Sequence, residues 1–386
     1  MKIIIAPDSF KGSLSAIEVA NAIDRGIKKA FAEAETVLLP VGDGGEGTME
    51  TLVAATGGEI RKVLVTGPLS NKVEAAYGIL GDGETCVIEM ATASGLHLVP
   101  EENLFPLRAT TFGTGELIRQ ALDDGFSSFI IGLGGSATND GGSGMLQALG
   151  LQILDSQGNE VGHGGGELNK VSKLDFTAFD KRINKSRFII ASDVQNPMLG
   201  PDGASYTFGP QKGAAADEVE LLDQNLTNWA DKIFEATGIE LHNLSGAGAA
   251  GGIGGAFQAF FPVEMKRGVD VVLDYINLDE ELENADLVIT GEGQVDNQTT
   301  FGKTPLGVSQ RAQSKEVPTI IIAGSVGKGI EVLHEFGVIS IHSIINKPMS
   351  LKEAIEKAGE LLEANAEQVV RSYFHQSLKE KGRLFA

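Results

Sequence analysis

Cysteine is almost absent from this sequence. Cys86 is the only one among 386 residues, so the chain cannot close an internal disulfide, and a zinc site built from several thiolates is excluded. No apolar run approaches the ~20 residues that a membrane-spanning helix needs. The apolar core at residues 3–6 is too short for a secretory signal. Together these absences predict a cytoplasmic protein without a membrane partner.

Basic residues are scarce. Lysine and arginine total 31 against 52 aspartates and glutamates, which gives a formal net charge of −21. Nucleic acids and anionic membranes attract basic patches, so this balance argues against both partners. The net charge does not exclude binding of small anionic ligands, because backbone N–H groups and a few well-placed lysines bind phosphate locally. Solubility alone would also explain the acid excess.

Glycine is abundant instead. It supplies 50 of the 386 residues, about 13% against a usual ~7%. These glycines form neither a collagen-like period nor a low-complexity tract, and they lie in loops between apolar runs. At this length, two domains are favoured over one.

The order of apolar runs predicts how these domains are built. Strand-like runs alternate with helical patterns at both ends of the chain, which is typical of a parallel sheet. In between, the runs at 60–66, 73–79 and 85–90 are joined by short turns, which indicates antiparallel pairing. We therefore predict an α/β fold of two domains. A Rossmann-like, parallel, three-layer domain is formed by 1–62 and 271–386, and a mixed α/β domain, 63–270, is inserted into it.

Most predicted strands end in a loop that carries an acid, a hydroxyl group, a lysine or several glycines. In an open α/β sheet, ligands bind at the carboxyl ends of the strands. Glycine lets N–H groups approach phosphate, and carboxylates suit magnesium. Any single loop is equally well explained as a tight turn or a helix cap, but their recurrence favours one shared site. The loop residues are Asp8, Ser9, Lys11, Asp43, Gly44, Gly45, Gly134, Gly135, Ser136, Asp193, Asn196, Glu292, Asp296 and Lys303.

A glycine tract at 246–251 (GAGAAG) offers an alternative function. It fits the dinucleotide-binding fingerprint, with Asp270 near the place of the ribose-binding acid. The preceding residues, 239–245, make a poor strand because polar side chains interrupt them. A nicotinamide-dependent oxidoreductase therefore stays open as a second hypothesis, and a non-catalytic sensor of nucleotides or sugar acids as a third. The six histidines lack metal-ligand spacing.

Several long motifs, in order along the chain, resemble those of the type I glycerate kinases, bacterial enzymes that phosphorylate D-glycerate with ATP. The resemblance implies two α/β domains with the active site in the cleft between them. It also implies ATP and Mg²⁺ as cofactors and D-glycerate as substrate. The motifs are 7–15 (PDSFKGSLS), 40–48 (PVGDGGEGT), 113–118 (GTGELI), 132–142, 193 with 196–197, 208–214 (FGPQKGA), 246–252, 290–293 (TGEG), 296, 298–299 and 302–303.

Residue roles follow as hypotheses once this resemblance is accepted. The loops at Gly44-Gly45 and Gly134-Gly135-Ser136, with Ser9, would hold the nucleotide phosphates through backbone N–H groups. Three lysines would neutralise charge on phosphate or on the glycerate carboxylate: Lys11, Lys212 and Lys303. Three aspartates are candidates for holding magnesium: Asp43, Asp193 and Asp296. One of these would accept the hydroxyl proton, and we favour Asp193. We favour 2-phosphoglycerate over 3-phosphoglycerate as the product.

Overall fold

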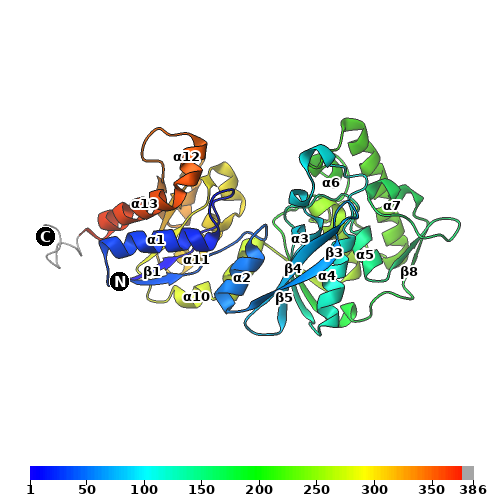
Figure 1. Cartoon of the computed structure of the whole chain (residues 1–386), viewed down its shortest axis with the longest axis horizontal. Helices are drawn as coiled ribbons and strands as arrows, with labels where there is room; N and C mark the ends of the chain where they lie inside the picture. The colour runs from blue at the N-terminus through cyan, green and yellow to red at the C-terminus, as the bar shows by residue number, and fades with distance from the viewer. Residues whose placement is uncertain (376–386) are drawn as a thin grey trace. The chain divides into compact units, whose positions relative to one another are not determined.

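The computed structural model describes residues 1–375; residues 376–386 and the side chains of Gln298 and Phe301 lie outside that description. The chain forms two compact units (Figure 1). Unit 1 combines Met1–Asp43 with the chain from Val269 onward, and unit 2 is Gly44–Gly268. The sequence predicts domains of 1–62 with 271–386, and of 63–270. In the structure the chain leaves unit 1 after Asp43, about twenty residues before the predicted boundary.

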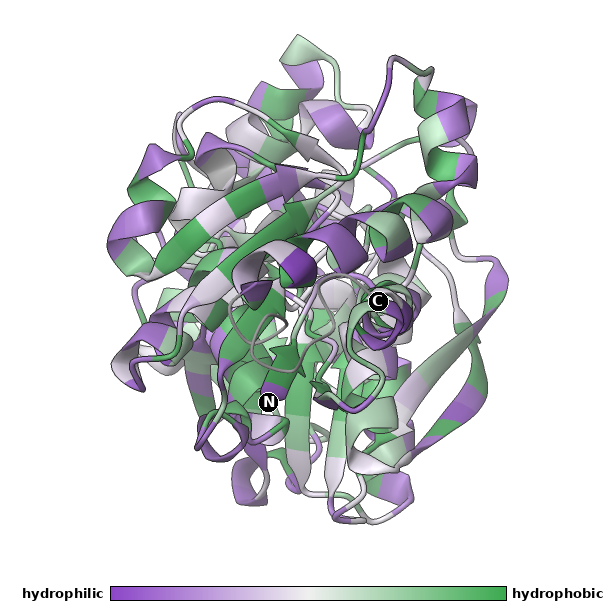
Figure 2. Cartoon of the chain, turned by 90° about the vertical axis from the view of Figure 1, so that its left-hand side faces the viewer, coloured by the Kyte–Doolittle hydropathy of each residue, from purple (hydrophilic) through white to green (hydrophobic). Residues whose placement is uncertain are grey.

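Unit 1 is built on a five-stranded sheet in which every pair of neighbouring strands is parallel. The order is β15-β13-β11-β1-β2. Its strands are β1 (Lys2–Ile5), β2 (Glu35–Leu38), β11 (Leu287–Thr290), β13 (Thr319–Ala323) and β15 (Val338–Ser343). Figure 2 shows these strands, beside the N-terminus, in the green of hydrophobic residues. The predicted parallel sheet, formed by both ends of the chain, is confirmed. A two-stranded parallel ladder, β12 (Gln294–Val295) with β14 (Ser325–Val326), accompanies it.

The helices of unit 1 bury apolar stripes against this sheet. The spacing of Ser15 and Glu18 predicts a capping box at a helix start, and helix α1 (Ala16–Ala30) begins with this capping box. It crosses α13 (Ala358–Tyr373) so closely that a Cβ added at Gly26 would lie 2.3 Å from the Glu363 carbonyl oxygen. The apolar stripe from Leu351 to Phe374 predicts one closing helix, but the structure splits this segment at Lys357 into α12 and α13. The other helices are α9 (Gly268–Tyr275), α10 (Leu278–Glu281), α11 (Thr304–Ser314) and α12 (Leu351–Glu356).

Unit 2 is built on a six-stranded mixed sheet of order β10-β9-β6-β5-β4-β3. The pairs β3/β4 and β4/β5 are antiparallel, as their short turns predicted, and the remaining pairs are parallel. The strands are β3 (Glu59–Thr66), β4 (Lys72–Ile79), β5 (Thr85–Glu89), β6 (Ser128–Gly132), β9 (Arg187–Ala191) and β10 (Val263–Lys266). A separate antiparallel pair is β7 (Gln152–Leu154) with β8 (Lys173–Asp175).

Helices complete the core of unit 2. They are α2 (Thr48–Thr56), α3 (Ala91–Ser94), α4 (Phe112–Asp123), α5 (Ser143–Ala148), α6 (Ala204–Phe208), α7 (Ala216–Thr237) and α8 (Ile253–Phe260). Trp229 of α7 is fully buried and donates a hydrogen bond to the Gly141 carbonyl oxygen at 2.9 Å. Helix α2 packs on β4, since a Cβ added at Gly78 would lie 2.5 Å from Val53. This packing explains why residues 44–62 belong to unit 2. Among residues 1–375, no helix has the length and apolar character to cross a membrane.

Candidate active site

Three acids lie in the loops that follow neighbouring strands of unit 1. Asp8 follows β1, Asp43 follows β2 and Glu292 follows β11, and these strands are adjacent in the sheet. Hydrogen bonds keep the loops together: the Asp8 N–H donates to the Gly291 carbonyl oxygen at 2.8 Å, and the Val41 N–H donates to that of Pro7 at 2.9 Å. We call Asp8, Asp43 and Glu292 the acidic cluster.

The acidic cluster resists carrying its full negative charge. Burial, together with the charges on Asp43 and Glu292, raises the pKa of Asp8 to about 7. Hydrogen bonds from the Thr304 hydroxyl at 2.6 Å and the Ser9 N–H at 2.6 Å partly offset these effects. Burial likewise raises the pKa of Glu292. A cation among these carboxylates would be stabilised, because it would neutralise negative charges that lie close together.

The other predicted residues of unit 1 lie around this cluster. The Lys303 ammonium is 3.3 Å from the Glu292 carboxylate. Asp296 is connected through Thr299, which accepts a hydrogen bond from the Asp296 N–H at 3.2 Å and donates one to Glu292 at 2.5 Å. Lys11 is exposed, and its backbone nitrogen would lie 3.4 Å from a Cβ added at Gly293. Unit 1 therefore gathers Ser9, Lys11, Asp43, Asp296 and Lys303 at one edge of its sheet.

The donor set of unit 1 fits magnesium only with help from a ligand. In the part of the chain that the structure describes, no group of three or more His, Cys, Asp or Glu side chains could hold a metal ion. Magnesium usually keeps several waters and takes one or two carboxylates, its remaining ligands being substrate phosphates. Paired aspartates such as Asp8 and Asp43 suit that mode of binding.

In unit 2, the two predicted phosphate loops pack directly against each other. A Cβ added at Gly132 would lie 2.8 Å from the Gly44 carbonyl oxygen, and one added at Gly134 would lie 2.8 Å from the Gly45 Cα. Gly44 and Gly135 also have positive φ angles of 86° and 73°. Only glycine allows both the conformation and this backbone approach. We call residues 44–47 and 132–136 the glycine-loop pair.

A buried carboxylate fixes the first of these loops. Glu89, at the end of β5, accepts the Met49 N–H at 2.7 Å and also the Gly47 N–H, at the start of α2. Burial raises its pKa to about 7 in spite of these two hydrogen bonds. The N–H groups of Gly47 and Met49 are thus engaged by the protein's own carboxylate. Glu89 is not among the site residues predicted from the sequence, although an acid at the end of an apolar strand is a usable signal.

A buried lysine fixes the second loop. The Lys212 side chain is only 1% exposed, and its ammonium donates to Ser136 Oγ at 2.9 Å and to the Thr138 carbonyl oxygen at 2.7 Å. Burial lowers its pKa to about 7, and the charge on Asp140 partly offsets that shift. Lys212 therefore holds the shape of the loop after β6. Whether it also neutralises a bound phosphate stays a prediction.

Asp140 anchors the far end of the same loop. Its side chain is completely buried and accepts hydrogen bonds from the Thr111 N–H at 2.8 Å and the Thr111 hydroxyl at 2.9 Å. The N–H groups of Gly142 and Gly144 donate to it as well. Burial raises its pKa. Because four donors converge on one carboxylate, the loop has little freedom to change shape.

Asp193 lies beside the glycine-loop pair and is exposed to solvent. It follows β9, and its carboxylate accepts the Gly268 N–H at 3.1 Å. Gly268 is in turn next to Gly44, because a Cβ added at Gly44 would lie 3.0 Å from the Gly268 Cα. Unit 2 therefore brings Gly44, Gly45, Gly134, Gly135, Ser136, Lys212 and Asp193 to one edge of its sheet.

The glycine tract at 246–251 has a packing role. Residues 239–245 form no strand in the structure, so the strand that a dinucleotide fingerprint requires is missing. A Cβ added at Gly251 would lie 2.0 Å from the Thr138 carbonyl oxygen. The small residues allow this tract to pack against the loop that Lys212 and Asp140 hold. This geometry does not support the oxidoreductase hypothesis.

Acidic and glycine-rich loops lie at the carboxyl ends of parallel strands in both α/β units, and such loops suit a phosphotransferase. The chain belongs to the glycerate kinase family, whose sequence pattern matches residues 3–374. It is accordingly an enzyme, a kinase. It is 50% identical to the glycerate kinase of Bacillus subtilis (strain 168) over 372 residues, which cover 96% of this chain and 97% of that protein.

Two further glycerate kinase relatives match this chain over similar lengths. The glycerate 2-kinase of Escherichia coli (strain K12) is 49% identical over 358 residues, or 93% of this chain and 94% of that one. A crystal structure from Salmonella typhimurium LT2, provisionally described as a glycerate kinase 2, superposes with a TM-score of 0.89 at 46% identity. The superposition covers 98% of this chain and 99% of the Salmonella chain. The predicted family and α/β fold class are confirmed.

Proposed function

We propose that this enzyme transfers the γ-phosphoryl group of ATP to D-glycerate in the cytoplasm and forms 2-phosphoglycerate. The observation that carries the proposal is the near-complete alignment, at about half identity, with relatives named glycerate kinase. The 2-position is favoured because one of these relatives is named a glycerate 2-kinase. The glycine-loop pair and the acidic cluster have the chemistry that phosphoryl transfer requires, which is positioning and charge neutralisation.

Mg²⁺ is the proposed metal, and Asp43, Asp193 and Asp296 are the candidates for holding it. When bound, it would neutralise charge on the phosphates during transfer. Backbone N–H groups of the glycine-loop pair, together with Ser9, would orient the phosphate oxygens. Lys11 and Lys303 would neutralise phosphate or the glycerate carboxylate. Lys212 would act through Ser136, by keeping the second loop in its binding shape.

The general base is the role for which two candidates compete. Asp193 is favoured because it is exposed, and because the Gly268 N–H fixes its orientation without burying it. Asp8 is the second candidate, since its pKa of about 7 lies close to the operating pH. The pH dependence of turnover separates them, because replacing the true base removes the acidic limb of the profile.

Phosphorus NMR of the reaction mixture tests this proposal directly. The enzyme is incubated with ATP, Mg²⁺ and D-glycerate, and the proton-coupled spectrum of the product is recorded. We expect a doublet, because phosphate on the 2-hydroxyl couples to the one proton on that carbon. A triplet would identify 3-phosphoglycerate and overturn the proposed regiochemistry. Absence of any phosphoglycerate, with ATP replaced in turn by other nucleoside triphosphates, would overturn glycerate as the substrate.

A further inference from the structure

Unit 2 contains an open hollow of about 600 Å³ that none of the roles proposed above uses. Three loops line it, at 69–70, 103–108 and 162–167. Its volume lies within the ~300–1,000 Å³ range of small-molecule sites. The wall combines the apolar side chains of Leu69, Phe105 and Leu107 with a few polar groups. An apolar lining with a small number of converging polar side chains is the usual composition of a ligand pocket.

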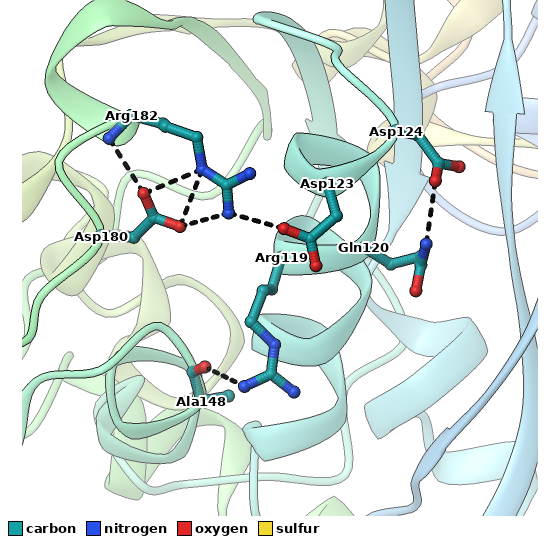
Figure 3. A network of polar contacts seen from close by, with 7 residues as sticks. All are labelled: Arg119, Gln120, Asp123, Asp124, Ala148, Asp180 and Arg182. Atoms are coloured by element: carbon teal, nitrogen blue, oxygen red, sulfur yellow. Dashed lines mark hydrogen bonds and ion pairs between the residues drawn. The ribbon is translucent and has the colours of Figure 1, made fainter.

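The arginine in this wall is unusual among those of the chain. The Arg108 guanidinium lies over the Phe105 ring, 5.7 Å from its centroid. Over residues 1–375, seven other arginines form a side-chain hydrogen bond and Arg267 also has an interaction, whereas the Arg108 guanidinium has neither a hydrogen bond nor an ion pair. Figure 3 shows two paired examples, Arg119 on the Ala148 carbonyl oxygen and Arg182 between two aspartates.

An arginine without an acid partner needs an explanation in a chain where acids outnumber bases by 52 to 31. The guanidinium presents five donors in a planar fork that matches carboxylate and phosphate. The carboxylate in the same wall does not meet this need, because Glu167 is 2.6 Å from the Lys170 ammonium. The hollow therefore offers a positive group that has no acidic side chain among residues 1–375 as partner.

A histidine stands in the same wall. The His163 ring packs against the Phe112 ring, with centroids 4.7 Å apart. Within residues 1–375, neither of its ring nitrogens has a hydrogen-bond partner. Either nitrogen can donate to an anion. Arg108 and His163 thus give the hollow two donors of the kind that binds oxyanions.

The walls are tied together before any ligand arrives. The Gly166 N–H donates to the Leu107 carbonyl oxygen at 2.9 Å. Gly164 has a φ of 98°, and a Cβ added there would lie 2.5 Å from the same oxygen. Three residues after Arg108, Thr111 is bound to the buried Asp140. Such preorganisation lowers the entropic cost of binding.

We propose that this hollow binds a small organic anion. Its carboxylate or phosphate would contact Arg108 and His163, and its apolar body would lie against Phe105 and Leu107. No residue assigned to ATP, magnesium or glycerate lines the hollow, so this is an additional ligand site. The proposal does not depend on which hydroxyl of glycerate is phosphorylated.

Fluorine NMR titration tests it with defined probes. The probes are 4-fluorophenyl phosphate, 4-fluorobenzoate and the neutral 4-fluorobenzyl alcohol, and the full-length enzyme is kept saturated with Mg²⁺, a non-hydrolysable ATP analogue and D-glycerate. We expect saturable binding of at least one anion. Arg108→Gln should weaken it by at least tenfold, since the variant removes a charge-assisted hydrogen bond to the anion. The alcohol should bind at least tenfold more weakly than the anions.

Arg187→Gln is the matched control, because Arg187 is also exposed but is paired with Glu264 at 3.3 Å. It should leave binding of the probes unchanged. Equal affinity in wild type and Arg108→Gln, displacement by raised D-glycerate or ATP analogue, or no saturable binding of either anion would each overturn the additional site. Glycerate phosphorylation is assayed separately and should be retained in Arg108→Gln, so failure of this proposal and failure of the proposed function are distinguishable.

Discussion

Four ionisable side chains are wholly or partly buried close to the proposed phosphate and metal loops: Asp8, Glu89, Asp140 and Lys212. In each, burial is the largest cause of the pKa shift, and it disfavours the charged form. For three of them the pKa lies at about 7. Small changes in their surroundings therefore change their charge at neutral pH.

The role of Asp193 is tested by replacing it with asparagine. If Asp193 is the general base, Asp193→Asn should lower kcat by about 100-fold or more, which is the usual contribution of a general base. The cooperative unfolding curve should not change, since the side chain is exposed and asparagine can still accept the Gly268 N–H. Asp8→Asn is the comparison. A near-normal kcat for Asp193→Asn, with loss of the acidic limb in Asp8→Asn, would transfer the role to Asp8.

Lys212 makes the stability of unit 2 depend on pH. The unfolded chain keeps this proton up to pH 10.5, whereas the folded protein loses it near pH 7. Between these values the unfolded state binds more protons, so the free energy of unfolding increases with pH. The contribution is at most about 1.4 kcal/mol per pH unit, and it is absent in Lys212→Met.

Urea unfolding at pH 7, 8 and 9, followed by the fluorescence of Trp229, measures this effect. The difference in unfolding free energy, wild type minus Lys212→Met, should increase with pH. The variant also leaves Ser136 Oγ and the Thr138 carbonyl oxygen without their donor, at a cost of about 1–3 kcal/mol. Lys62→Met, at an exposed lysine paired with Glu74, should show a difference that is independent of pH. A flat difference for Lys212→Met would contradict the assigned ionisation.

At the scale of elements, the start of α2 depends on a side chain from another strand. Glu89 of β5 accepts the N–H groups of Gly47 and Met49, which would otherwise be unsatisfied at the helix start. Glu89→Ala should lower the unfolding free energy of unit 2 by about 2 kcal/mol. Trp229 fluorescence during urea unfolding measures it. Glu84→Ala, at an exposed turn residue, should stay within about 0.5 kcal/mol of wild type, and an equal effect of both variants would refute the capping role.

The two loops of the glycine-loop pair pack so closely that there is no room for side chains between them. Gly134→Ala would place a methyl group 2.8 Å from the Gly45 Cα, so the two loops must separate. We expect the KM for MgATP to increase by at least tenfold, about 1.4 kcal/mol, while D-glycerate affinity changes little. Steady-state kinetics measures both. Gly359→Ala is the control, because nothing lies within 4 Å of its added Cβ, and unchanged nucleotide kinetics in Gly134→Ala would exclude this loop from the nucleotide site.

The sequence was sufficient for most elements because their patterns are local. The capping box at Ser15 and Glu18 and the antiparallel turns between β3 and β5 depend on neighbouring residues only. The split of the last helix at Lys357 was missed, since the apolar stripe continues through it. The 246–251 tract shows that motif spacing alone does not identify a binding site. Gly251 packs against the backbone of a loop more than a hundred residues earlier in the chain, and no local pattern reveals this contact.

The candidate site could be predicted only in part, because some of its contacts join segments that are far apart in the chain. Acids after adjacent parallel strands can be expected to meet, and Asp8, Asp43 and Glu292 do so. The pairing of Lys212 with Ser136 spans 76 residues, and that of Glu89 with Met49 spans 40. No local pattern encodes such pairs, because they depend on how distant segments pack. They are also the contacts that give the loops their shape.

At the scale of the whole molecule, unit 2 is a continuous insertion whose two ends touch. Gly44 and Gly268 are its first and last residues, and their backbones pack together. Domains whose termini are close tolerate excision well. A fragment of residues 44–268 should therefore fold alone, with cooperative urea unfolding and a buried Trp229. Residues 1–43 joined to 269–386 by a short glycine-serine linker should fold as well. Circular dichroism and fluorescence test both, and a non-cooperative transition in the 44–268 fragment would contradict its independence.

The pairing of β1 with β11 has a consequence for how the chain is made. The Lys2 N–H donates to the Asp286 carboxylate, 284 residues later. At about 5–20 residues per second, a ribosome needs roughly a quarter of a minute to a minute to cover that distance. During this interval the N-terminal segment has left the exit tunnel, and β1 can pair with β2 but not yet with β11. The unfinished polypeptide, rather than the mature enzyme, is therefore the form most exposed to aggregation and most dependent on chaperones.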